Sequence, residues 1–344
     1  MNKCNLCQRN NADRKGSHIV PHFLLKRIEN IDGKTGRDYE IGYEIGRLKA
    51  SPHFGRSVPP EKLEEIFGKI TDNEIDNNQH PLIADYFLCS ECEDRLAQIE
   101  SKYSQTINTI DKTEYKSGIS SSSGMLFWIS VFWRMSVYRG NGMQLTAEQN
   151  ELLRGVLDYH LSKNDDKFLD ESNLINILSY KIIRCHNCEQ NDAKWLLFNT
   201  EFCNSLCLFI DEFVVVLSLN GHYDEFKPID CFGINDLILD APTNTWSGNE
   251  VIKPFDRSIF IELCKRIAYK MTLVYIDGLG EFFDEVYVAA GGKGDKMPEN
   301  VKREIMESIV SNEIQVGRKY TPKDIVNSTC EVMSKHGMLS NDLK

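Results

Sequence analysis

The chain has 344 residues, of which 41% are hydrophobic, enough for two or three domains that each bury a core. Its net charge of −11 argues against a protein that coats nucleic acid over its whole surface. It has 11 cysteines and no N-terminal apolar stretch that resembles a signal peptide. We therefore expect a cytoplasmic protein whose thiols bind metal or are buried.

Two Cys-x2-Cys pairs mark the N-terminal part of the sequence. The first pair is Cys4 and Cys7, and the second is Cys89 and Cys92. Two such pairs supply four soft thiolates, which satisfy the tetrahedral coordination of Zn²⁺. The spacing therefore predicts a structural zinc site that staples residues 1–92 together. Four thiols buried without a metal are the alternative interpretation.

Charge is unevenly distributed along the chain. Residues 1–56 contain 11 Lys and Arg and 6 Asp and Glu, a net charge of +5, so the remainder carries −16. Lysine and arginine gain affinity for a polyanion because they release its counterions. The basic segment therefore favours contact with the phosphates of DNA or RNA, although ordinary scatter of surface charge would give a similar count.

Helical periodicity follows the second cysteine pair. Leu96, Ile99 and Tyr103 recur at helical spacing, so we expect a helix that leaves this pair. A polar stretch ending at residue 124 is interpreted as a linker, and the apolar segment 125–138 predicts a buried helix. We place the domain boundary here, between residues 1–105 and residues 124–344. The apolar run is shorter than the roughly 18–20 residues that span a bilayer, so no membrane association is expected.

The second domain is predicted to begin with a helix and to continue into a small antiparallel sheet. Thr146 and Gln149 form the pattern of a capping box ahead of helically spaced leucines. Runs rich in Phe and Val follow between about residues 195 and 240. The pair Asn220-Gly221 predicts a hairpin between the run 206–219 and an apolar run that ends at residue 239.

Helical spacing returns in the C-terminal third of the chain. It extends from Asp256 to about residue 271 and again from Val301 to Ile309. We expect the last helix to have Thr321 as its N-cap, Pro322 in its first turn and Gly337 at its end. The predicted fold class is therefore α+β.

A third Cys-x2-Cys pair lies in the second domain. Cys185 and Cys188 are followed by Cys203 and Cys207, so a second zinc site is an open alternative. Cys207 lies in an apolar run that predicts a strand, where a cysteine acts as a small buried hydrophobe.

The N-terminal motifs resemble the HNH nucleases of the ββα-metal fold, in the group whose zinc knuckles flank the active site. The resemblance covers residues 1–105 and rests on the two cysteine pairs, the segment Ser17-His18-Ile19-Val20-Pro21 and the segment Leu88-Cys89-Ser90-Glu91-Cys92 that opens a helix. It implies an HNH-like, zinc-bound head; the patterns in the rest of the sequence predict the larger α+β body with a small antiparallel sheet that follows it.

The resemblance also implies roles for individual residues. His18 takes the position of the general base that activates water, and Glu93 takes the position of a ligand to one divalent cation. The family commonly has Asp before the histidine, whereas this chain has Ser17, a neutral and weaker ligand. A carboxylate at Glu93 favours Mg²⁺ or Mn²⁺. Asp85 is a candidate for the motif asparagine and a possible further ligand of the catalytic cation, and Glu93 has the alternative role of complementing the helix dipole.

The function that follows is metal-dependent hydrolysis of phosphodiester bonds in DNA or RNA. Related heads occur in bacterial phage-defence nucleases, where an ATPase often activates them, so an activating protein partner is expected by analogy. Lys15, Lys26 and Arg27 surround His18 in the sequence and are the cations that we expect to contact nucleic acid. The alternative is a zinc-ribbon adaptor without catalysis that binds nucleic acid or a protein.

Overall fold

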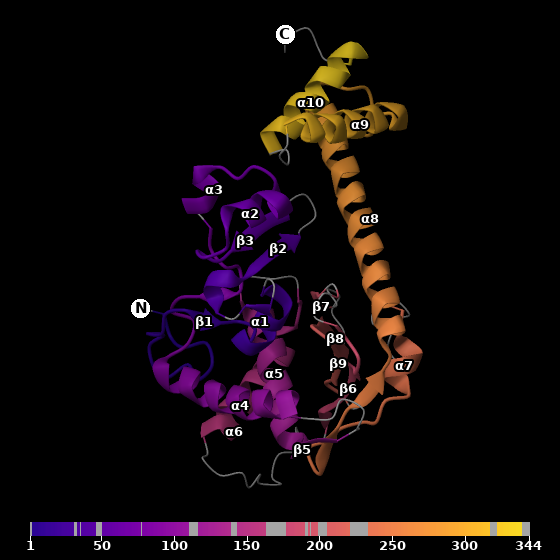
Figure 1. Cartoon of the computed structure of the whole chain (residues 1–344). Coiled ribbons are helices and arrows are strands. Elements are labelled where there is room, and N and C mark those ends of the chain that lie inside the picture. The colour runs from indigo at the N-terminus through magenta and orange to yellow at the C-terminus, as the bar shows by residue number, and fades with distance from the viewer. Residues whose placement is uncertain are drawn as a thin grey trace. The chain divides into compact units, whose positions relative to one another are not determined.

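A computed structural model describes most of the chain. The described residues are 2–30, 33–34, 36–45, 50–76, 78–109, 116–138, 143–162, 177–189, 192, 194–198, 205–220, 233–316 and 322–338. Two compact units divide them, one formed by residues 1–35 and 82–267 and the other by residues 36–81 and 268–344. Mixed α and β structure is present in the chain, as the sequence predicts (Figure 1).

The first unit contains a short ββα arrangement near the N-terminus. Strand β1 (Ser17–His18) pairs antiparallel with β4 (Ile83–Ala84), which places His18 opposite Ile83. Helix α1 (His22–Glu29) follows β1, and α4 (Ser90–Thr109) follows β4. The helix predicted after Cys92 is confirmed, and it begins two residues before this cysteine.

Helix α5 (Ser121–Val137) is the centre of the first unit. Every side chain from Met125 to Met135 is buried, because α4 and α6 (Ala147–Ser162) pack beside this helix (Figure 1). The predicted linker ending at residue 124 is wrong. Its serines form the first turn of α5, where the Ser120 hydroxyl accepts a hydrogen bond from the Ser123 backbone N–H at 3.3 Å. Serine favours this N-cap position, so a run of serines marks a helix start as well as a loop.

The capping box of α6 is confirmed. The Thr146 hydroxyl accepts a hydrogen bond from the Gln149 N–H at 3.1 Å, and the Gln149 side chain accepts one from the Thr146 N–H at 3.0 Å. On its outer side α6 is linked to the N-terminal segment. Arg154 donates to the Leu6 carbonyl oxygen at 2.8 Å, and Arg9 pairs with Asp158 at 2.8 Å.

The predicted antiparallel sheet is confirmed in part. It has five strands, and its order is β11 (Lys253–Phe255), β6 (Ser179–Cys185), β9 (Phe213–Ser218), β8 (Ser205–Ile210) and β7 (Leu196–Phe198). All neighbours are antiparallel except β11, which runs parallel to β6. All residues of β6, β8 and β9 are buried, so these strands do not alternate between a buried and an exposed face; β8 and β9 are mostly apolar, whereas β6 also buries Lys181 and Arg184.

The turn in this sheet differs from the predicted one. Strands β8 and β9 are joined through Asp211 and Glu212, where Asp211 adopts a φ of 53°. Asparagine and aspartate tolerate this conformation better than other non-glycine residues. The run ending at residue 239 is a helix, α7 (Asn235–Leu239), and not a strand; Gly221 lies outside the described residues. Strand β10 (Asn249–Val251) pairs with β5 (Lys116–Ser120).

The second unit is mainly helical. Its remaining elements are η2 (Arg37–Tyr39), β2 (Ile41–Ile45), β3 (Ala50–Phe54), α2 (Pro60–Phe67), α3 (Asp72–Asp76), α9 (Glu299–Val316) and α10 (Pro322–Lys335). Helix α8 (Arg257–Ala289) begins in the first unit and ends in the second. Phe283 of α8, Ile305 of α9 and Val332 of α10 belong to one buried cluster.

The C-terminal predictions hold for the described residues. Helices occur at the predicted positions, and Gly337 follows α10 with a φ of 65°, a conformation that glycine adopts at helix ends. Thr321 lies outside the described residues. Among the helices that the structure describes, none combines the length and the apolar character needed to cross a bilayer.

Candidate functional site

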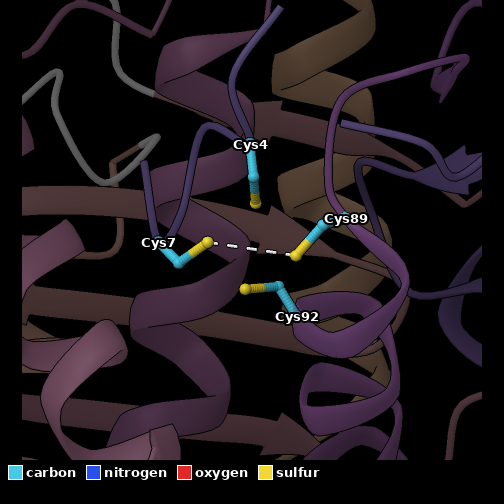
Figure 2. Close-up of side chains that lie close together, drawn as sticks. All are labelled: Cys4, Cys7, Cys89 and Cys92. Carbon is cyan, nitrogen blue, oxygen red and sulfur yellow. Dashed lines mark hydrogen bonds between the residues drawn. The ribbon is translucent and has the colours of Figure 1, made fainter. Parts of the chain in front are cut away.

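The four cysteines of the first two pairs meet in one buried cluster. Their sulfur atoms all lie within 4.8 Å of one another, and Figure 2 shows them pointing toward a common centre. The Cys7 and Cys89 sulfurs are 3.9 Å apart. A tetrahedron with Zn–S bonds of about 2.3 Å has edges of about 3.8 Å, so the donor set and its spacing fit a zinc ion. Cys4, Cys7, Cys89 and Cys92 would hold it.

The thiols influence one another strongly because they are buried together. The Cys92 thiol donates to the Cys4 sulfur and lowers the pKa of Cys4 to about 4. The same contact raises the pKa of Cys92, and burial raises the pKa of Cys89. Four thiols in this volume cannot all ionise without a compensating cation, since each thiolate disfavours the next. A divalent metal ion would supply that compensation.

Local structure explains why the two pairs face one another. The Cys4 N–H donates to the Asn10 carbonyl oxygen at 2.9 Å and closes the first knuckle. Cys89 immediately precedes α4 and Cys92 lies in its first turn, where the positive end of the helix dipole favours thiolates. The Asp13 carboxylate caps α4 by accepting from the Ser90 N–H at 2.7 Å, which ties the two knuckles together.

The residues that flank His18 are joined to the second knuckle. The Ser17 hydroxyl donates to Glu93 Oε2 at 2.8 Å, a contact between β1 and the first turn of α4. Ser17 is buried and Glu93 is half-buried. Burial raises the pKa of Glu93, whereas the hydrogen bond from Ser17 and the charge of Arg134 oppose this rise. The structure therefore brings the sequence-predicted residues Ser17 and Glu93 together beside the zinc cluster.

Arg134 fixes the backbone of His18. Its Nη1 donates to the His18 carbonyl oxygen at 2.8 Å, and its Nη2 pairs with Glu100 of α4 at 2.7 Å. The Arg134 side chain is only 2% exposed, so this charge is almost fully desolvated. Sequence reasoning assigned Arg134 to the apolar core and missed this contact. The signal was an arginine inside a long apolar run, since a buried arginine requires a charged or carbonyl partner.

Two further residues contact His18 or the residues that precede it. The His22 ring lies 5.2 Å from the His18 ring between centroids, at the start of α1, and sequence reasoning did not single it out. Asp85 is exposed and accepts a hydrogen bond from the Gly16 N–H at 2.8 Å, one residue before Ser17. Asp85 thus shapes the entry to β1; its role as a metal ligand or as the motif asparagine stays a prediction.

No preformed cage for a second cation involves these residues. Within the described part of the chain, His18, Glu93 and Asp85 do not belong to a group of three ligand side chains within 4.8 Å of one another. Mg²⁺ does not require such a cage, because it retains several water ligands and is often held by one or two carboxylates and the substrate phosphates. Glu93 would supply the carboxylate.

The predicted phosphate-contacting cations have different surroundings. Lys15 is exposed, and its ammonium lies 5.6 Å from the centre of the Tyr86 ring. Lys26 is half-buried on α1. Arg27 pairs with Asp211 at 2.5 Å and with Glu212 at 3.0 Å. Two carboxylates therefore neutralise Arg27, and Lys15 is the better placed of the three to contact a phosphate.

The proposed second zinc site is not formed by the residues that the structure describes. Cys207 is buried in β8, Cys185 ends β6, and Cys203 lies outside the described residues. Cys185 and Cys188 do not belong to a described group of three possible metal ligands.

The motifs and their geometry do not by themselves assign the chain to a family. The buried four-cysteine cluster is compatible with the HNH resemblance and with other zinc-binding modules alike. The division into a head of residues 1–105 and a body of residues 124–344 stays a prediction. Comparison with protein-family models, with curated proteins and with solved structures finds no match for this chain.

Proposed function

We propose that the chain is a metal-dependent, HNH-like endonuclease that hydrolyses phosphodiester bonds of nucleic acid. The observation that carries the proposal is the hydrogen bond between Ser17 and Glu93, at 2.8 Å. It joins the strand that bears His18 to the helix that bears Glu93, directly beside the four-cysteine cluster. Residues 76 positions apart in the sequence are thereby joined.

The chemistry assigns one task to each residue. His18 takes a proton from the attacking water, a role that suits imidazole because its ordinary pKa lies near neutrality. Arg134, which is paired with Glu100, binds the His18 carbonyl oxygen and thereby fixes the position of the His18 backbone. Glu93 holds Mg²⁺ or Mn²⁺, which when bound stabilises the charge that develops on the phosphate. Zinc in the cysteine cluster has a structural role.

Binding of the substrate is assigned to the basic N-terminal segment. Residues 1–56 carry a net charge of +5, and Lys15 is exposed two residues before Ser17. Replacing Lys15 with Gln should weaken binding of DNA or RNA and reduce the slope of log affinity against log salt by about 1, the contribution of one phosphate contact. Lys335→Gln, an exposed residue of α10, is the matched control and should leave this slope unchanged.

The catalytic assignment is tested by cleavage of plasmid DNA and single-stranded RNA with Mg²⁺ or Mn²⁺ present. His18→Ala should lower the rate about 100-fold or more, the range of general-base catalysis, without rescue by metal. Glu93→Gln keeps the Ser17 contact but loses charge, and higher metal concentration should partly restore its activity. His336→Gln, at the exposed position that follows α10, is the control for loss of a histidine elsewhere in the chain.

An adaptor that binds nucleic acid without cutting it is the second candidate function. Ser17 favours it, because a neutral hydroxyl stands where the related nucleases commonly have an aspartate. If wild type binds nucleic acid but does not cleave it with any tested metal or activating ATPase, the adaptor function replaces the nuclease. Equal cleavage by wild type and His18→Ala would leave a nuclease with a different base.

A further inference from the structure

A second pair of thiols lies at the end of the central sheet, apart from the zinc cluster. Cys185 is the last residue of β6 and is completely buried, whereas Cys188 is half-buried in the turn that follows. Asn187 and Glu189, which flank Cys188, are both exposed. A small molecule can therefore reach Cys188 from solvent, and Cys185 lies behind it.

A lysine is in contact with the outer thiol. Lys194 Nζ lies 2.8 Å from the Cys188 sulfur and 3.2 Å from Asp211 Oδ1. The Lys194 side chain is only 9% exposed, so the ammonium is held in place by burial as well as by its two partners. An ammonium at this distance stabilises a thiolate directly.

The two sulfurs are not equivalent. Cys185 and Lys194 lower the pKa of Cys188, with the Cys185 thiol as the larger cause. Conversely, the Cys188 sulfur and burial raise the pKa of Cys185. Cys185 therefore holds its proton more tightly than Cys188. A half-buried thiol whose pKa is lowered, next to a second thiol that can resolve it, is the arrangement that redox-active cysteine pairs use.

The surroundings disfavour a metal ion at this pair. The Lys194 ammonium points its positive charge at the Cys188 sulfur, where a cation would have to bind. The nearest histidine in sequence, His186, is engaged with the Phe255 carbonyl oxygen at 2.9 Å and with Asp256 at 3.2 Å. The Asp192 carboxylate, which also interacts with Cys188, is bound by Arg257 at 2.6 Å, so two thiols with a cation already in place suit an uncharged oxidant better than they suit Zn²⁺.

We propose that Cys185 and Cys188 form a peroxide-sensitive dithiol. The Cys188 thiolate attacks one oxygen of hydrogen peroxide, the O–O bond breaks, and the departing hydroxide takes up a proton to give water. Cys188 becomes a sulfenic acid. Cys185 then loses its proton and attacks that sulfur, the S–O bond breaks, and a second water leaves as the disulfide forms. Two thiols are oxidised by two electrons and one peroxide is reduced.

Oxidation of the pair would change the charge at one end of a chain of contacts that reaches helix α1. With the thiolate gone, Lys194 keeps Asp211 as its anionic partner, and Asp211 also accepts a hydrogen bond from Arg27 of α1 at 2.5 Å. Helix α1 begins four residues after His18. The dithiol is thus joined to α1 by a chain of charged contacts, whatever the activity of the candidate site.

The test treats the zinc-loaded, full-length protein with increasing hydrogen peroxide and maps its cysteines by mass spectrometry. Cleavage by trypsin after Arg184 and Lys194 gives a peptide that contains Cys185 and Cys188 and no other cysteine. We expect this peptide to become lighter by two hydrogen atoms and to resist alkylation until it is reduced. Cys185→Ser should stop at a sulfenic acid that dimedone traps on Cys188, and Cys188→Ser should leave Cys185 unoxidised.

The lysine contact is tested separately. Lys194→Met should slow oxidation of Cys188 at neutral pH by about tenfold, because less of the thiol is ionised. Lys270→Met, an exposed residue of α8, is the matched control and should react like wild type. Equal rates in wild type and Lys194→Met would overturn the proposal. So would a second zinc ion per chain that Cys185→Ser removes.

Discussion

The stability of the first unit should depend on pH through one buried carboxyl group, Glu250. This residue of β10 is completely buried and accepts hydrogen bonds from Tyr180 at 2.7 Å and from Tyr103 at 3.2 Å. Trp128 in turn donates to the Tyr103 hydroxyl at 2.9 Å. Burial raises the pKa of Glu250 to about 7, although the hydrogen bonds from Tyr180, Ser117 and Tyr103 oppose this rise.

The direction of this pH dependence follows from the raised pKa of Glu250. The folded pKa of about 7 lies above the ordinary value of 4.5, so the folded state holds the proton more tightly than the unfolded state. The stabilisation is complete below pH 4.5 and is lost as the pH rises through 7. The difference between these two pKa values corresponds to about 3 kcal/mol of stability, of which about 2 kcal/mol is lost between pH 5.5 and 8.

The assay is urea unfolding of zinc-loaded wild type and Glu250→Gln at several pH values in this range. Glutamine retains the shape and cannot ionise, so the free energy of unfolding of wild type should fall relative to that of the variant by about 2 kcal/mol as the pH rises. Taking the difference removes the titration of groups common to both proteins. Glu285→Gln, at an exposed position of α8, is the control. A difference between wild type and Glu250→Gln that does not change with pH would refute the reasoning.

Three other variants test the packing around the candidate site. Cys89→Ser should remove the zinc found by elemental analysis and lower the free energy of unfolding by about 4 kcal/mol, as for loss of a cross-link across some 80 residues; unchanged stability of metal-free protein would contradict it. Arg134→Met should cost about 3–5 kcal/mol in urea unfolding because it leaves Glu100 unpaired, and Glu100→Gln in the same chain should recover part of the loss. Gly124→Ala should cost at least about 1–3 kcal/mol, since the added carbon would lie 2.3 Å from Glu250 Oε1. Gly155→Ala, in α6 with nothing within 4 Å of the added carbon, should be neutral or stabilising, and similar thermal unfolding of both alanine variants would contradict the clash.

The sequence by itself determined the features that depend on local spacing. Each of the first two Cys-x2-Cys pairs specifies a knuckle, because two intervening residues bring two thiols to one side of a turn. Helical periodicity identified α4, and the capping box of Thr146 and Gln149 located the start of α6. These predictions held because neighbours along the chain supply all the atoms involved.

Local sequence patterns gave wrong predictions where contacts with distant parts of the chain decided the conformation. The serines before Gly124 have the composition of a linker, but they form the first turn of α5 because Ser120 caps this helix and Ser121 donates to the Thr245 carbonyl oxygen. The run ending at residue 239 has the composition of a strand, yet it is the short helix α7. A short apolar run does not distinguish a strand from a buried helix by periodicity.

Only the tertiary structure decided which charged groups lie beside His18. The contact of Ser17 with Glu93 joins positions 76 residues apart, and the contact of Arg134 with the His18 carbonyl oxygen joins positions 116 apart. The buried group around Glu250 likewise draws Tyr103 and Tyr180 from separate elements. Sequence periodicity does not predict such pairs, because they depend on which helices and strands pack together. Their strength depends on the exclusion of water that this packing creates.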